Sequence, residues 1–126
     1  MATRIKKHAK KKQLERRSAP RASGHLAVSF KEAGVEFRAE TKNLSASGTY
    51  CTLDRFVSPM TKLSLYFELP DGKERVKIHC TGVVVRVEPI ASRLDKPRYH
   101  MAVFFSDISD QSRAVIARYV RERLSA

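Results

Sequence analysis

The chain has 126 residues, of which 42% are apolar and 30% are charged, and its formal net charge is +12. This length fits a single domain, and the apolar fraction excludes a chain that is disordered throughout. No stretch reaches the roughly 18 consecutive apolar residues of a membrane span, and the N-terminus lacks the apolar core of a secretory signal. We therefore expect a cytoplasmic protein.

The positive charge is concentrated in the N-terminal segment. Residues 1–22 carry nine basic side chains and one acidic side chain, Glu15. A block of like charge without apolar periodicity is typical of a solvated segment, so we predict a flexible basic arm. We divide the chain into a basic tail at 1–14 and one domain at 15–126. The lysines of the tail also allow nonspecific contact with nucleic acid or with anionic membrane.

Alternating apolar and polar residues predict the first strands. Two strands are expected on either side of a turn at 32–34, and their inward positions are Leu26, Val28 and Phe30 in the first and Val35, Phe37 and Ala39 in the second. The clearest strand runs from Lys62 to Leu69. It ends at a hairpin turn made by Pro70, Asp71 and Gly72.

The next strand changes its inward face along its length. Its apolar residues lie first on one parity and then on the other, as Val76, Ile78 and Cys80 followed by Val83, Val85 and Val87. Gly82 stands at the change. A change of face at a glycine predicts a β-bulge, which bends a strand as barrel closure requires.

The last strand, from Arg98 to Phe105, is apolar on both faces near its end. We expect a helix at Asp110 to Leu124 to cover it, because apolar residues recur there at helical spacing, as Val115, Ile116, Tyr119 and Val120. The opposite face of that helix is interpreted as solvated and carries Arg113, Arg118, Arg121 and Arg123. About six short strands and one terminal helix indicate a mainly-β fold, a small antiparallel barrel or sandwich.

No catalytic or metal-binding constellation is visible. The four histidines are scattered, and the acidic residues do not form pairs that would separate their pKa values. Cys51 and Cys80 lie 29 residues apart, without a cysteine or histidine at metal-ligand spacing. We therefore predict that the chain is not an enzyme, that it needs no cofactor or metal, and that both thiols are reduced and packed in the core.

One pattern that carries chemistry is the arginine-rich segment that ends the basic arm. Arg17 and Arg21 lie four residues apart, and Pro20 favours extended geometry in the residue before it. At about 3.3 Å per residue, the two side chains start roughly 13 Å apart. Such an arm can place two guanidinium groups on opposite sides of a ligand the size of a dinucleotide. Arginine binds both phosphate and the O6/N7 edge of guanine in bidentate fashion.

A second pattern is the segment from Asn43 to Gly48. In an extended strand, Asn43 and Ser45 point to one face and Leu44 to the other. Leu44 reaches the core only if the inward phase shifts after Ala39, and that shift would turn Asn43 and Ser45 outward as a short polar platform. Gly48 permits a tight turn or close approach of a ligand, because it has no Cβ.

The order and spacing of the two patterns resemble the PilZ domain, a bacterial receptor module for cyclic di-GMP. In that family an Arg-Arg-x-x-x-Arg loop precedes the first strand, and an Asp/Asn-x-Ser-x-x-Gly motif follows on the next. The resemblance covers residues 15 to about 123. It implies a six-stranded antiparallel β-barrel with a C-terminal helix, an unidentified effector protein as partner, and cyclic di-GMP bound by Arg16, Arg17, Arg21, Asn43, Ser45 and Gly48.

One departure from the family and two other functions remain open. The family often has a glycine within the last strand, where this chain has His100, Met101 and Ala102. The chain could instead be a small basic barrel that binds nucleic acid through Lys6 to Lys12, because lysine runs bind phosphate backbones without sequence choice. It could also be a PilZ-like adaptor that has lost its ligand. Motility, adhesion and exopolysaccharide control are all consistent with the family.

Overall fold

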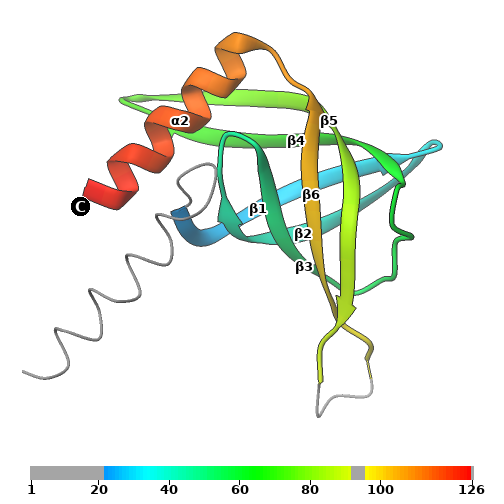
Figure 1. The fold of residues 1–126 in the computed structure, drawn as a ribbon. Helices are drawn as coiled ribbons and strands as arrows, with labels where there is room; N and C mark the ends of the chain where they lie inside the picture. The colour runs from blue at the N-terminus through cyan, green and yellow to red at the C-terminus, as the bar shows by residue number, and fades with distance from the viewer. Residues whose placement is uncertain (1–21, 92–95, 126) are drawn as a thin grey trace, which may run out of the picture.

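The computed structural model describes residues 22–91 and 96–125, and within them the strands close into a barrel (Figure 1). The elements are β1 (Ala22–Glu32), β2 (Val35–Leu44), β3 (Gly48–Leu53), β4 (Lys62–Asp71), β5 (Glu74–Pro89), β6 (Tyr99–Asp107) and α2 (Asp110–Ser125). The strand order around the barrel is β1-β2-β3-β6-β5-β4, and all neighbours are antiparallel. The predicted six-stranded barrel with a C-terminal helix is therefore confirmed for the described residues, and most of the basic arm lies outside them.

A short turn joins the two strands in each of the two hairpins that the sequence predicted. Between β1 and β2 the chain passes through Ala33 and Gly34, whose φ angles are 49° and 84°. Between β4 and β5 it passes through Gly72, with a φ of 65°. Positive φ at these positions matches the right-handed twist of the flanking strands. The hairpins fix the register of β1 against β2 and of β4 against β5.

The barrel interior holds the residues that the alternation places inward. Phe30 and Phe37 pair directly across β1 and β2, and their rings stack with centroids 5.4 Å apart. Leu63, Leu65, Phe67 and Leu69 of β4 are all buried. Val35 is the exception, because it lies at the outer end of the β1–β2 hairpin and is 54% exposed. The inward prediction was therefore wrong for Val35, since the hairpin extends beyond the core at that point.

Strand β5 bends where it passes from β4 to β6 (Figure 1). Its inward alternation continues through Gly82 to Val84, and the face changes at Val85, which is 55% exposed. The inward prediction was therefore wrong for Val83 and Val85. The register against β6 slips between Thr81 and Gly82 and again between Val84 and Arg86, so Val85 is the extra residue. A register slip was correctly expected at Gly82, but the change of face comes three residues later.

Gly82 has a packing role instead of marking the change of face. A Cβ on Gly82 would lie 2.5 Å from Cγ1 of Val103 and 3.0 Å from Cδ1 of Leu65. The core therefore has no room for a side chain at this inward position. Glycine is required there by crowding inside the barrel.

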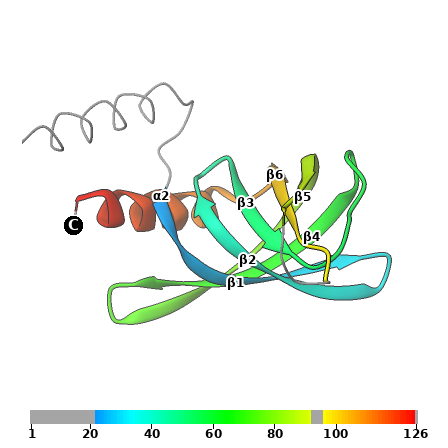
Figure 2. The ribbon, with the colours of Figure 1, turned by 90° about the horizontal axis from the view of Figure 1, so that it is seen from below.

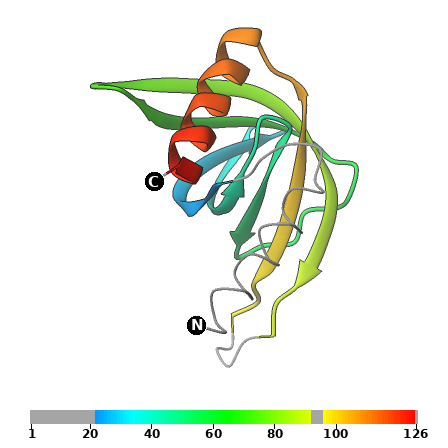
Figure 3. The same cartoon turned by 60° about the vertical axis from the view of Figure 1, so that its left-hand side comes forward.

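Helix α2 lies against one end of the barrel, beside the start of β1 (Figures 2 and 3). It begins directly after β6, and the Ser109 hydroxyl caps it by accepting from the Ser112 N–H at 3.1 Å. Its buried face packs mainly on β4, with smaller contacts to β1 and β5, and comprises Val115, Ile116, Tyr119 and Val120. The expectation that α2 covers β6 was wrong: Phe104 of β6 points outward and stays 52% exposed.

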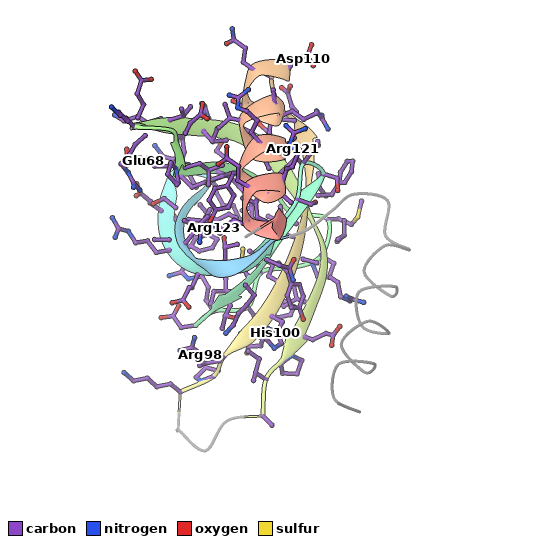
Figure 4. The ribbon with its side chains drawn as sticks, turned by 90° about the vertical axis from the view of Figure 1, so that its left-hand side faces the viewer. Glu68, Arg98, His100, Asp110, Arg121 and Arg123 are labelled. Carbon is purple, nitrogen blue, oxygen red and sulfur yellow. The ribbon has the colours of Figure 1, made fainter. Side chains whose placement is uncertain are left out.

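The arginines of α2 make specific contacts instead of facing only solvent. Arg118 forms an ion pair of 2.9 Å with Asp71 at the β4–β5 hairpin, and this hydrogen bond raises the pKa of Arg118 above its ordinary value. Arg123 lies over the Tyr119 ring, 5.0 Å from its centroid. Figure 4 shows Arg121 and Arg123 on this helix. Across the residues that the structure describes, no helix is long and apolar enough to cross a membrane.

Both cysteines are buried and free, as predicted. Burial raises the pKa of Cys51 from 9.0 to about 11. Burial, together with the nearby negative charge of Asp107, raises the pKa of Cys80 from 9.0 to about 12. Both thiols therefore stay protonated at neutral pH, and a protonated, buried thiol is a poor nucleophile.

Candidate functional site

The end of β2 carries the phase shift that the second sequence pattern requires. Against β3, Thr41 pairs with Cys51 and Asn43 pairs with Tyr50, so Lys42 is an extra residue in β2. The shift buries Leu44 and leaves Asn43 half-buried. The prediction that the inward phase changes between Ala39 and Leu44 is thereby confirmed.

Ser45 does not belong to the polar platform that the sequence predicted on the barrel surface. Its side chain is 1% exposed, so the outward orientation that we expected for it is wrong. The Ser45 hydroxyl accepts from the backbone N–H groups of Ser47 and Gly48, at 3.2 Å each. Serine commonly satisfies backbone donors two or three residues ahead in this way, and a satisfied hydroxyl can be buried at little cost. Ser45 therefore holds the turn at 45–48 together.

Gly48 allows the start of β3 to approach β6 closely. A Cβ on Gly48 would lie 2.3 Å from the carbonyl oxygen of Val103, closer than real Cβ atoms come. The turn is bonded to β6 at the same place, because the Phe105 N–H donates to the Ser47 carbonyl at 2.9 Å. The close contact that Gly48 allows in this structure is thus with the β6 backbone, and the close approach of a ligand stays a prediction.

Helix α2 also reaches this turn. The guanidinium group of Arg113 donates to the carbonyl of Ala46 at 3.4 Å. The predicted solvated face of the helix included Arg113. The spacing of residues within one helix does not show which loop lies beside it, so this contact could not be predicted. The turn at 45–48 is therefore held by β6 on one side and contacted by α2 on the other.

The barrel surface beside the turn is formed by outward residues of β3, β6 and β5 in register. Gly48 pairs with Phe104, and Phe104 pairs with Val83. In the next outward row, Tyr50 pairs with Ala102, and Ala102 pairs with Arg86. The Tyr50 ring stacks on His100, which Figure 4 labels on β6, with ring centroids 5.1 Å apart. The sequence patterns did not predict this surface, although the apolar residues on both faces of β6 were a signal for it.

Removing the Ser45 hydroxyl tests its role in the turn. We expect Ser45→Ala to lower the free energy of unfolding by about 1 kcal/mol, because two backbone N–H donors lose their acceptor. Urea denaturation of the variant and the wild type measures this difference. Thr81→Ala, at a half-buried position on β5, is the control and should change stability less. Equal stability of Ser45→Ala and wild type would contradict the assignment.

The arginine pattern lies outside the described residues, so the structure does not position Arg16, Arg17 or Arg21. The described chain begins immediately after Arg21, however, and its start is informative. Ala22 pairs with Leu44, and Ser23 pairs with Asn43. The residue that follows the arginine pattern therefore lies opposite the first residues of the second pattern.

Comparison with known proteins identifies the family. The sequence model of the PilZ domain matches residues 15–122. No curated protein sequence matches the chain.

Solved structures share the fold. The inhibitor of motility MotI/DgrA from Bacillus subtilis superposes with a TM-score of 0.75 at 23% identity, over 87% of this chain and 52% of that one. The PilZ domain of YcgR from Escherichia coli, solved with c-di-GMP, gives a TM-score of 0.68 at 13% identity, over 87% of this chain and 92% of that one. The K. pneumonia MrkH–c-di-GMP complex gives 0.65 at 16% identity, over 87% and 53%.

The chain thus spans about half the length of MotI/DgrA and of MrkH. At these identities the structural likeness establishes the fold, while the family assignment rests on the match over most of the sequence. The resemblance inferred from the two sequence patterns is confirmed, and the chain belongs to the PilZ domain family.

Proposed function

We propose that this chain is a cyclic di-GMP receptor that binds its ligand between the arginine pattern and the segment from Asn43 to Gly48. The observation that carries the proposal is the pairing of Ala22 with Leu44. It places the residue that follows the arginine pattern opposite the second pattern, although 21 residues lie between Ala22 and Leu44 in the sequence. The YcgR domain and MrkH, which share the fold, were both solved with c-di-GMP.

The two patterns have different roles in this proposal. Arg16, Arg17 and Arg21 donate to the phosphates and guanine edges of the ligand, since the guanidinium fork binds both in bidentate fashion. Asn43 offers hydrogen bonds from the barrel surface. Ser45 and Gly48 act by positioning, because the Ser45 hydroxyl holds the turn and Gly48 lets the turn lie against β6.

Ligand binding is proposed to work as a signal instead of a reaction. PilZ domains are non-catalytic, so the chain is not an enzyme, as predicted. We propose that the bound ligand orders the basic arm in the cytoplasm and changes the surface that an effector protein meets. The net charge of +12 attracts the anionic ligand over long range, so binding should weaken as salt is raised. Motility, adhesion and exopolysaccharide control remain the candidate processes.

Calorimetric titration with cyclic di-GMP at near-physiological salt tests the proposal. We expect saturable binding to the wild type and none with GTP. The double variant Arg17→Ala/Arg21→Ala should bind at least tenfold more weakly, because each good guanine contact contributes about 1–3 kcal/mol. Lys10→Ala/Lys11→Ala is the matched control, because it removes the same charge from the tail. Absence of binding by the wild type would refute the proposal.

A further inference from the structure

The outward face of β6 holds an aromatic side chain beside the turn at 45–48. Phe104 is 52% exposed, and its cross-strand neighbours are Gly48 on β3 and Val83 on β5. Helix α2 does not cover it. Because Gly48 has no side chain, no side chain of β3 stands opposite Phe104 in this row, beside the turn that the proposed function assigns to the ligand.

The space next to Phe104 has a shallow floor. Ala102 lies two residues before Phe104 on the same outward face of β6, and its side chain is only a methyl group. Outward neighbours on one strand are about 7 Å apart. Gly48 and Ala102 therefore form a low area on this surface, which we call the step, where larger side chains would otherwise stand.

A second aromatic ring bounds this step. Tyr50 pairs with Ala102, and its ring stacks on His100 at a centroid distance of 5.1 Å and an interplanar angle of 19°. His100 lies beyond Ala102 in the direction away from Phe104. The stack thus draws the Tyr50 ring away from Phe104, and the only β6 side chain between Phe104 and His100 on this face is the methyl group of Ala102.

We propose that a guanine base of cyclic di-GMP stacks on the Phe104 ring, above Gly48 and Ala102. The inference rests on the proposed function and extends it to a side chain outside both sequence patterns. Bases stack on exposed aromatic rings in single-stranded nucleic acid sites, where alanine substitution typically weakens binding by about tenfold. The missing side chain at Gly48 lets the base lie against the ring, with its edge toward the turn at 45–48.

Affinity measurements test the stacking contact. We expect Phe104→Ala and Phe104→Leu to bind cyclic di-GMP about tenfold more weakly than wild type, because neither variant has a ring face. Tyr66→Ala is the matched control, since Tyr66 is an outward aromatic residue on β4, 41% exposed and stacked on His79. Its affinity should equal that of wild type.

A fluorescence measurement reports the contact directly. The chain contains no tryptophan, so Phe104→Trp places a single indole at the proposed site. We expect this variant to keep its affinity and its fluorescence to change on addition of cyclic di-GMP. Tyr66→Trp should show no change. Ala102→Val should weaken binding, because it raises the floor beside Phe104, and Ala102→Gly should not.

The outcomes separate this inference from the proposed function. If the wild type binds and Phe104→Ala binds equally well, the stacking contact is overturned while the receptor function stands. A Phe104→Trp variant that still binds the ligand without a change in fluorescence would overturn the stacking contact in the same way. If the wild type does not bind cyclic di-GMP, both the proposed function and this inference are overturned.

Discussion

Replacing Gly48 by alanine is expected to lower the free energy of unfolding by about 2–3 kcal/mol, the upper part of the usual range for overpacking. The added Cβ would stand 2.3 Å from the carbonyl oxygen of Val103 and 3.4 Å from the Cα of Phe104. Both are backbone atoms of β6, so no side-chain rotation relieves the clash. The start of β3 must move away from β6, and the turn at 45–48 must move with it.

Urea denaturation measures the loss of stability, and titration with cyclic di-GMP measures the consequence for the site. We expect the affinity of Gly48→Ala to fall as well, because the displaced turn no longer holds Asn43 and Phe104 in the same relation. Ser47→Ala is the control, since it alters a half-buried residue of the same turn without adding an atom near β6. It loses only the hydrogen bond of 3.0 Å between the Ser47 and Ser45 hydroxyls, so its loss of stability should be smaller. Unchanged stability in Gly48→Ala would mean that β3 can retreat freely.

Much of the barrel could be predicted because a period of two in the sequence directly encodes which face of a strand is buried. Lys62 to Leu69 alternates strictly, and the structure buries the residues that the pattern selects. Strand β3 could not be delimited in this way. It buries Thr49 and Thr52 along with its apolar residues, so its pattern of hydrophobicity is weak.

Bulges and close approaches were predicted less well, because they depend on the neighbouring strand. One extra residue turns every following side chain to the opposite face of the strand, and the sequence does not show which residue is the extra one. In β2 the burial of Leu44 required a shift, which the structure places at Lys42. In β5 the glycine marked a register slip correctly but not the change of face, which comes at Val85. Gly82 itself is required by the packing of Val103 and Leu65 against it.

The same reasoning explains what was missed at the candidate site. The motif residues were recognised by type and spacing, yet Ser45 proved to satisfy backbone donors inside its own turn. The amphipathic pattern of α2 predicted a helix over the last strand, yet it does not specify the strand on which the helix packs, and Phe104 stays exposed. Only the register of β3, β6 and β5 brings Phe104 beside Gly48.

Truncation of Ile116 to alanine should give a loss of stability of about 2–5 kcal/mol. Ile116 lies on the face of α2 that packs against the barrel and is fully buried. The cavity left by the missing carbon atoms cannot fill unless the helix moves. Urea denaturation of Ile116→Ala against wild type measures the loss. Gln111→Ala, at an exposed position of the same helix, is the control and should stay within about 0.5 kcal/mol of wild type.

The Ile116 variant also probes the link between the helix and the turn at 45–48. Arg113 donates to Ala46 from the first turns of α2, so a loosened helix should weaken that contact. We therefore expect Ile116→Ala to bind cyclic di-GMP more weakly even at a temperature where it remains folded. Arg113→Ala separates the two effects, because it removes the contact and leaves the buried face intact. If Ile116→Ala loses affinity and Arg113→Ala does not, the helix acts on the site by another route than this hydrogen bond.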